Sequence, residues 1–336
     1  MMSDDALIKV RDLKVHFPMR RGMTLRKKAP SFIKAVDGVS FNIQSGEVLA
    51  LVGESGCGKT TIGKTIMQLI EPAAGKIFYS GEDLAQLKGR PLQVFRQKMQ
   101  LIFQDPYESL DPRQSVYEIL AEPLIIHKRC SSKKELEKRI FESLEAAGLY
   151  PASEFVGRYP HHLSGGQRQR VAIAAAIILQ PEFLVTDEPV SMLDVSIRAE
   201  IIKLMLDLRG QKSLTYLFIT HDLSLAWMIA DRILVLYLGK IVELGPADEV
   251  IHQASHPYTK ALVSVIPLTH PKPGRDQKIL EGETPSALTI PKGCRFHPRC
   301  WRFQELGKPE VCQLVEPELV NIKERHSVAC HFIDKE

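Results

Sequence analysis

The feature that most constrains this chain is a glycine-rich segment, GESGCGKT, at residues 53–60. An apolar run at 47–52 precedes it and predicts a buried strand, and residues 60–70 after it predict a helix. Glycines allow successive backbone N–H groups to point at one anion, and the N-terminus of the following helix adds positive charge. Strand, glycine loop and helix in this order predict a phosphate-binding loop in an α/β protein.

The loop supplies candidate nucleotide ligands. Lys59 can reach the β- and γ-phosphates, and the Thr60 hydroxyl is placed to bind Mg²⁺. Cys57 lies among the N–H groups, where its pKa could be lowered; the alternative is a small residue that the loop tolerates. The nucleotide-binding residues predicted here are Gly53, Glu54, Ser55, Gly56, Cys57, Gly58, Lys59, Thr60 and Thr61.

Two carboxylates follow a second predicted buried strand at 183–186. Asp187 can hold Mg²⁺ through water. Glu188 points to the other side of an extended chain and can polarise an attacking water. We therefore predict Asp187 as a metal ligand and Glu188 as the general base of phosphoryl transfer.

A second anion-binding element lies in the segment LSGGQ at 163–167, just before a predicted helix at 168–179. A serine and two glycines open that helix, so its N–H groups can cradle a phosphate. Two anion-binding elements in one chain indicate a dimer in which each nucleotide lies between the glycine-rich loop of one subunit and the LSGGQ segment of the other. The predicted residues are Ser164, Gly165, Gly166 and Gln167.

Composition excludes several classes for this chain of 336 residues. A hydrophobic fraction of 44% and a net charge of +4 exclude global disorder, and they give no argument for a nucleic-acid partner. The longest apolar run, 171–179, is about half the length of a membrane-spanning helix. An acidic N-terminus without an apolar core predicts no secretory signal.

The order of predicted elements favours a largely parallel sheet covered by helices on both faces. Strands are expected at 7–10, 13–17, 35–43, 216–220 and 232–238, and an amphipathic helix at 133–149. The basic stretch at 19–30 is expected to be a solvated loop; a contact with a partner or lipid headgroups is the alternative.

These motifs resemble the ATP-binding subunits of ABC transporters over about residues 7–258. The resemblance implies an α/β P-loop NTPase of ABC type, with a RecA-like core of mostly parallel sheet, an antiparallel β subdomain and a helical subdomain at about 88–165. It implies an ATPase (nucleotide-binding) domain at 1–260 and a small Cys-rich extension at 261–336. ATP and Mg²⁺ are the implied nucleotide and metal.

The resemblance also assigns roles to single residues. Gln104 resembles the glutamine that links Mg²⁺ to the membrane partner, and Asp194 lies in the segment SMLD, similar to the D-loop. His221 resembles the histidine that contacts the γ-phosphate. Phe17 is similar in position to the aromatic residue that stacks on adenine; a core residue of an edge strand is the alternative. The catalytic set is then Glu188, His221, Lys59 and Gln104, and the Mg²⁺ set is Thr60, Gln104 and Asp187.

Further segments resemble the dipeptide, oligopeptide and nickel importer group: AVDGVSF at 35–41, SHPYTKAL at 255–262 and CRFHPRC at 294–300. The resemblance implies peptide import powered through two transmembrane permease subunits, with a second related ATPase subunit and an extracytoplasmic peptide-binding protein. It implies a location at the cytoplasmic face of the inner membrane. The alternatives are a soluble ABC ATPase of DNA repair or translation, and an importer of nickel or another small solute.

Four cysteines gather near the end of the chain, without the C-x₂-C pairs typical of zinc ribbons. Four thiolates suit a [4Fe–4S] cluster or Zn²⁺ equally well. The resemblance favours the iron–sulfur cluster; zinc and four free thiols are the alternatives. The predicted ligands are Cys294, Cys300, Cys312 and Cys330.

Overall fold

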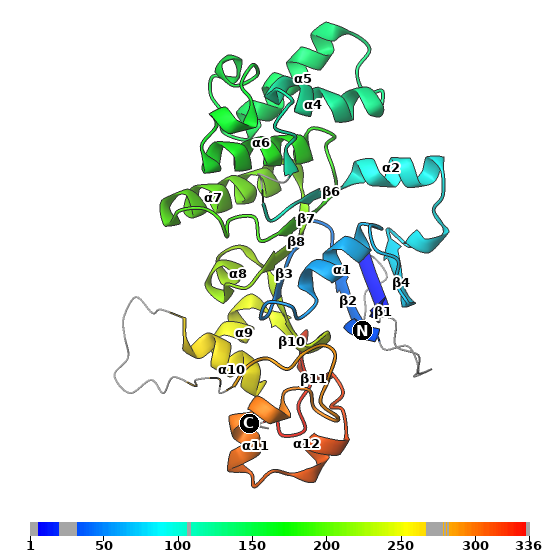
Figure 1. The fold of residues 1–336 in the computed structure, drawn as a ribbon, viewed down its shortest axis with the longest axis vertical. Coiled ribbons are helices and arrows are strands. Elements are labelled where there is room, and N and C mark those ends of the chain that lie inside the picture. Colours follow the sequence, from blue (N-terminus) through cyan, green and yellow to red (C-terminus); the bar gives the residue numbers. More distant parts are fainter. Residues whose placement is uncertain are drawn as a thin grey trace, which may run out of the picture. The chain divides into compact units, whose positions relative to one another are not determined.

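The computed structural model describes residues 6–19, 32–105, 109–266, 278, 280 and 282–333 (Figure 1). Most of the basic stretch predicted as a solvated loop, residues 20–30, lies outside the described residues. The chain divides into two compact units. The first unit contains Met1–Ile43, Val48–Ala85 and Ile219–Glu336, and the second contains Gln44–Glu47 and Gln86–Phe218.

The first unit contains an antiparallel sheet in the order β2-β1-β4-β5. The sequence predicted two short strands at 7–10 and 13–17, but the structure has one strand, whose pairing with β2 shifts between Val10 and Leu13. Asp12 lies there with φ of 44°, a backbone conformation typical of a bulge. The strands are β1 (Ile8–Pro18), β2 (Phe32–Ile43), β4 (Ala74–Tyr79) and β5 (Glu82–Asp83).

A mixed sheet forms the rest of this unit's framework, in the order β11-β12-β10-β9-β3. Strand β3 pairs in parallel with β9, whereas β9, β10, β12 and β11 pair antiparallel. Every residue of β3 and β9 is buried, as their apolar sequences require. These strands are β3 (Val48–Val52), β9 (Arg232–Tyr237), β10 (Lys240–Pro246), β11 (Val320–Lys323) and β12 (His326–Val328).

Short helices complete the first unit. Phe296 is 1% exposed and packs against Tyr237 and Tyr258, so residues 282–333, called here the C-terminal segment, share the core of β9 and β10. In Figure 1 this segment is drawn in orange and red. The helices are α1 (Lys59–Ile66), α8 (Leu223–Ile229), α9 (Ala247–His252), α10 (Pro257–Ser264), η4 (His297–Arg299), α11 (Trp301–Glu305) and α12 (Glu310–Leu314).

The second unit combines strands in the order β8-β7-β6 with a stack of helices. Ile140 and Leu144, on the apolar face of the predicted helix at 133–149, are fully buried against the helices on either side in the stack, which confirms that amphipathic pattern. The elements are α2 (Arg90–Lys98), β6 (Met99–Ile102), α4 (Val116–Ile126), α5 (Lys133–Ala146), η2 (Ala152–Glu154), η3 (Pro160–His162), α6 (Gly165–Ile177), β7 (Phe183–Asp187), α7 (Val195–Lys212) and most of β8 (Thr215–Thr220). The short helix η1 (Leu84–Gln86) has its first two residues in the first unit.

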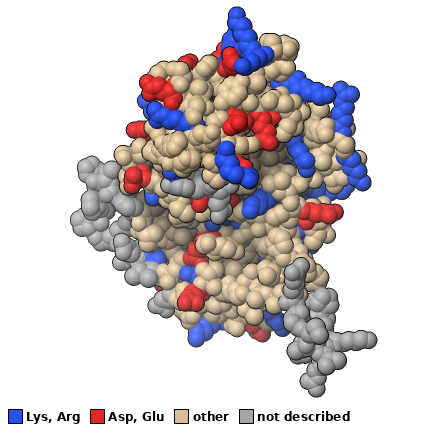
Figure 2. Space-filling model, turned by 45° about the horizontal axis from the view of Figure 1, so that its top comes forward, with Lys and Arg blue, Asp and Glu red and all other residues tan. Residues whose placement is uncertain are grey.

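Charge is mixed on the surface. On the face drawn in Figure 2, Lys and Arg side chains are interspersed with Asp and Glu, in keeping with the small net charge. Within the described ranges, every helix is too short or too polar to cross a bilayer.

Candidate nucleotide-binding site

The glycine-rich loop joins β3 to α1 in the first unit, as predicted. Its lysine is already oriented by the loop: the Lys59 ammonium donates to the carbonyl oxygens of Gly53, at 2.7 Å, and Glu54, at 3.0 Å. Gly58 has φ of 109°, and a Cβ there would lie 2.3 Å from the carbonyl oxygen of Ala35. Only glycine fits this position, so the loop has the backbone that a phosphate cradle requires.

Cys57 is 1% exposed inside this loop. Burial raises the pKa of its thiol, the opposite of the lowering that surrounding N–H groups could produce. A neutral, small side chain is therefore the interpretation that the structure supports.

Two further predicted residues lie in the first unit. Phe17 is 36% exposed on β1, so it is not the core residue that the alternative interpretation required. His221 is exposed directly after β8, and the next residue, Asp222, caps α8 by accepting from the N–H groups of Ser224 and Leu225. Both predicted ligands therefore have accessible rings.

In the second unit, the structure brings together two residues 84 positions apart in sequence. The Gln104 side-chain amide donates to the carboxylate of Glu188 at 3.1 Å. Asp187, 6% exposed, ends β7, and Glu188 follows with φ of 47°. The backbone thus turns at Glu188, where the sequence predicted an extended chain.

The segment LSGGQ opens α6, which begins at Gly165, three residues before the predicted start. Ser164 and Gln167 form a capping box: the Ser164 hydroxyl accepts from the Gln167 backbone N–H, and the side-chain Oε1 of Gln167 accepts from the Ser164 backbone N–H. Asp194 is exposed and immediately precedes α7. The helix N-terminus predicted to face a phosphate is thus present.

The iron–sulfur prediction is wrong. Among the residues that the structure describes, no group of three or more His, Cys, Asp or Glu side chains could hold a metal ion, which also removes the zinc alternative. Cys294, Cys300, Cys312 and Cys330 form no disulfide and line one apolar hollow of about 20 Å³, room for roughly one water. Burial raises the pKa of Cys294 to about 12 and of Cys300 to about 11, which disfavours the thiolate that binds metals.

Sequence reasoning missed two arginines of the C-terminal segment, Arg295 and Arg299. Arg299 pairs with Glu54 of the glycine-rich loop at 2.8 Å, and Arg295 pairs with Asp37 at 2.6 Å. Although burial alone would raise the pKa of Asp37, Arg295 lowers it to about 2. The signal was available, because both arginines lie inside the segment CRFHPRC that carried the resemblance.

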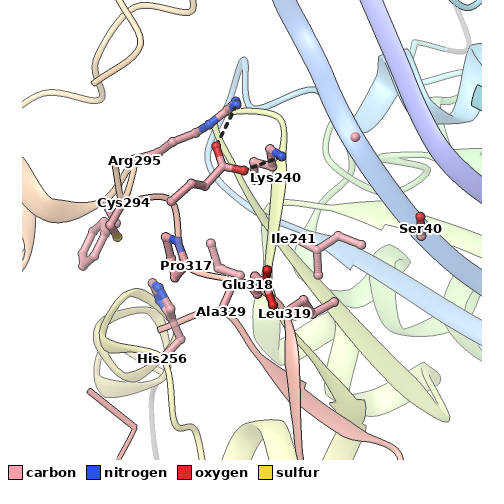
Figure 3. A pocket seen from close by; sticks show the side chains of 14 residues that line it. Ser40, Lys240, Ile241, His256, Cys294, Arg295, Pro317, Glu318, Leu319 and Ala329 are labelled. Atoms are coloured by element: carbon pink, nitrogen blue, oxygen red, sulfur yellow. Dashed lines mark ion pairs between the residues drawn. The ribbon is translucent and has the colours of Figure 1, made fainter. Parts of the chain in front are cut away.

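A larger cavity of about 570 Å³ lies beside Arg295 in the first unit (Figure 3). Glu316 lies between two cations there, 2.5 Å from Lys240 and 3.6 Å from Arg295. The carboxylate of Glu316 thus balances positive charge of Lys240 and Arg295 at the wall of this cavity.

Comparison with known proteins decides the family. Residues 36–191 match the family described as ABC transporter, and residues 242–305 match the oligopeptide/dipeptide transporter C-terminal region. The chain is 43% identical over 322 residues to the dipeptide transport ATP-binding protein DppF of Haemophilus influenzae, covering 96% of this chain and 95% of that protein. This chain belongs to the ATP-binding proteins of ABC transporters.

Other relatives and a solved structure indicate the same family. The oligopeptide transport ATP-binding protein AppF of Bacillus subtilis is 45% identical over 333 residues, which are 98% of each chain. A solved structure of the ATP-binding cassette MJ0796, a dimer in a post-hydrolysis state bound to ADP and Pi, is 29% identical with a TM-score of 0.62, covering 71% of this chain and 98% of that one. The ABC protein therefore has the predicted α/β P-loop fold, with a mixed sheet where the sequence predicted a largely parallel one, and it is an ATPase for which ATP and Mg²⁺ are expected.

Proposed function

We propose that this ABC ATPase hydrolyses ATP to drive import of dipeptides or oligopeptides through separate permease subunits. One observation carries the proposal: the similarity to peptide-transport ATP-binding proteins extends over nearly the whole chain, including the C-terminal region. DNA repair, translation and nickel import are not favoured by these relatives.

We propose the following roles for residues of the first unit in binding the nucleotide. Lys59 and the loop N–H groups bind the phosphates, since the loop already has the required backbone and two of its carbonyl oxygens hold the Lys59 ammonium. Phe17 stacks on adenine through its exposed ring. His221 contacts the γ-phosphate.

In the second unit, Glu188 accepts a proton from the attacking water as general base. Its carboxylate is oriented by the Gln104 amide, which supports this role. Thr60, Gln104 and Asp187 are the proposed ligands of Mg²⁺, which when bound neutralises charge on the phosphates. The Ser164–Gly166 turn, with Asp194, completes the nucleotide site of the second ATPase subunit, since a capped helix N-terminus suits an anion.

We further propose that the chain has an ATPase domain at 1–260, with its helical subdomain at about 88–165, and an extension at 261–336. Its partners are two transmembrane permease subunits and a second related ATPase subunit, with an extracytoplasmic peptide-binding protein acting indirectly. The complex places this chain at the cytoplasmic face of the inner membrane.

The test is the ATPase activity of the reconstituted complex in lipid vesicles, measured with and without candidate peptides and the peptide-binding protein. Stimulation by peptide-loaded binding protein supports the proposal. Stimulation by nickel alone, or no effect of any peptide on a complex that hydrolyses ATP, would contradict it.

A further inference from the structure

We infer that Arg299 is a positioning residue of the glycine-rich loop, holding and neutralising Glu54 so that the loop accepts the nucleotide phosphates. The inference rests on the proposed use of this loop for ATP. It gives the C-terminal segment a direct role in nucleotide affinity.

Glu54 is held at three points. Its N–H donates to the Tyr258 hydroxyl at 3.0 Å, and its carbonyl oxygen accepts from Lys59. Its carboxylate accepts from Arg299 at 2.8 Å and from the Thr284 hydroxyl. Three of these contacts come from residues after the predicted nucleotide-binding motifs: Tyr258, Thr284 and Arg299.

The charge of Glu54 explains why such a hold is needed. A carboxylate on the second residue of a loop that binds phosphate repels the ligand unless a cation compensates it. The Arg299 side chain is only 8% exposed and lies on that carboxylate, so water screens the pair little. Arg299 thereby removes a like-charge repulsion from the phosphate site, and Thr284, within 3.2 Å of it, fixes its orientation.

Arg295 adds a second, indirect hold from the same short segment. Its guanidinium donates to the Leu238 carbonyl oxygen at 2.5 Å and to Asp37. The adjacent Gly239 donates its N–H to the carbonyl oxygen of Cys57, and its own carbonyl oxygen accepts from Asp37. Arg295 also pairs with Glu316, at 3.6 Å. The two arginines, on either side of η4, therefore fasten the loop at Glu54 and behind Cys57.

The test measures Mg²⁺-ATP affinity of the full-length chain by titration calorimetry. Arg299→Gln leaves Glu54 uncompensated, and we expect it to weaken binding about tenfold. Adding Glu54→Gln to that variant removes the repulsive charge and should restore affinity to within about threefold of wild type. The matched control is Arg325→Gln, at an exposed position of the same C-terminal segment, which should bind as wild type.

Urea unfolding of each variant, measured beside the titrations, separates positioning from folding, because Glu54→Gln also relieves any destabilisation that an unpaired carboxylate causes. We expect Arg299→Gln to be folded and yet to bind more weakly; a loss of affinity only together with a loss of the fold would overturn the inference. Wild-type affinity in Arg299→Gln would overturn the inference, as would a double variant as weak as the single one. Failure of the wild-type chain to bind Mg²⁺-ATP would contradict the proposed function, and the inference with it.

Discussion

At the scale of a single residue, Glu188 is the proposed general base. Its carboxylate is held by Gln104, and the substitution Glu188→Gln keeps its size while removing its basicity. We expect ATP affinity to be retained and the steady-state ATPase of the assembled transporter to fall about a hundredfold. Glu305→Gln, at an exposed position on α11, is the control and should hydrolyse ATP as wild type. Undiminished turnover in Glu188→Gln would remove its assignment as general base.

His256 gives the first unit a dependence on pH. It is 1% exposed, and burial lowers its pKa to about 4 from an ordinary 6.5. As pH falls from 6.5 toward 4, the unfolded chain binds a proton that the folded chain does not, so stability falls in that window. Between about pH 7 and about pH 5 this residue should cost the fold about 2 kcal/mol.

The substitution His256→Asn tests this. Its side chain can still accept from the Tyr258 N–H and cap α10, as His256 does at 3.1 Å, but it does not titrate. Trp227 and Trp301 both lie in the first unit, so urea unfolding followed by tryptophan fluorescence reports on it. The variant should lose less unfolding free energy between the two pH values than wild type; equal losses would contradict the assignment.

At the scale of an element, the N-terminus of α6 combines stability with a proposed phosphate contact. Ser164→Ala removes the capping box and should lower the free energy of unfolding by about 1 kcal/mol. Ser164→Asp keeps a good cap but places a negative charge where we expect phosphate. It should be as stable as wild type by circular dichroism and yet lose ATPase activity in the complex. An active Ser164→Asp complex would contradict a phosphate contact here.

The sequence predicted those elements whose signals are local. Buried β3, the loop and α1 follow from an apolar run, glycines and a helix pattern, and the carboxylates after β7 follow in the same way. The predicted break in β1 was wrong, because a bulge at Asp12 interrupts the alternation without ending the strand. For α6, the apolar pattern predicted only the body at 168–179, because glycines carry no periodic signal; the serine and two glycines before it indicated the opening that the structure has at Gly165.

The long-range pairings could not be predicted. Strand β12 pairs with β10 across 80 residues of chain, and His326 is buried with its ring nitrogens 2.8 Å from Glu243 and 3.1 Å from Glu249. Nothing local in 320–328 indicates that partner. The cysteine error has a similar origin: the clustering of four thiols indicated a metal site and the resemblance favoured an iron–sulfur cluster, but the fold packs those thiols in an apolar environment that raises the pKa of three of them.

At the scale of the whole molecule, this chain is the proposed ATP-hydrolysing part of a peptide importer. The most direct measurement is ATP-dependent accumulation of a labelled dipeptide by vesicles that carry the assembled complex, with binding protein on the side where peptide is supplied. We expect accumulation with the wild-type chain and almost none with Glu188→Gln at the same complex content. Equal accumulation by the two complexes would contradict it, as would a wild-type complex that hydrolyses ATP without moving any peptide.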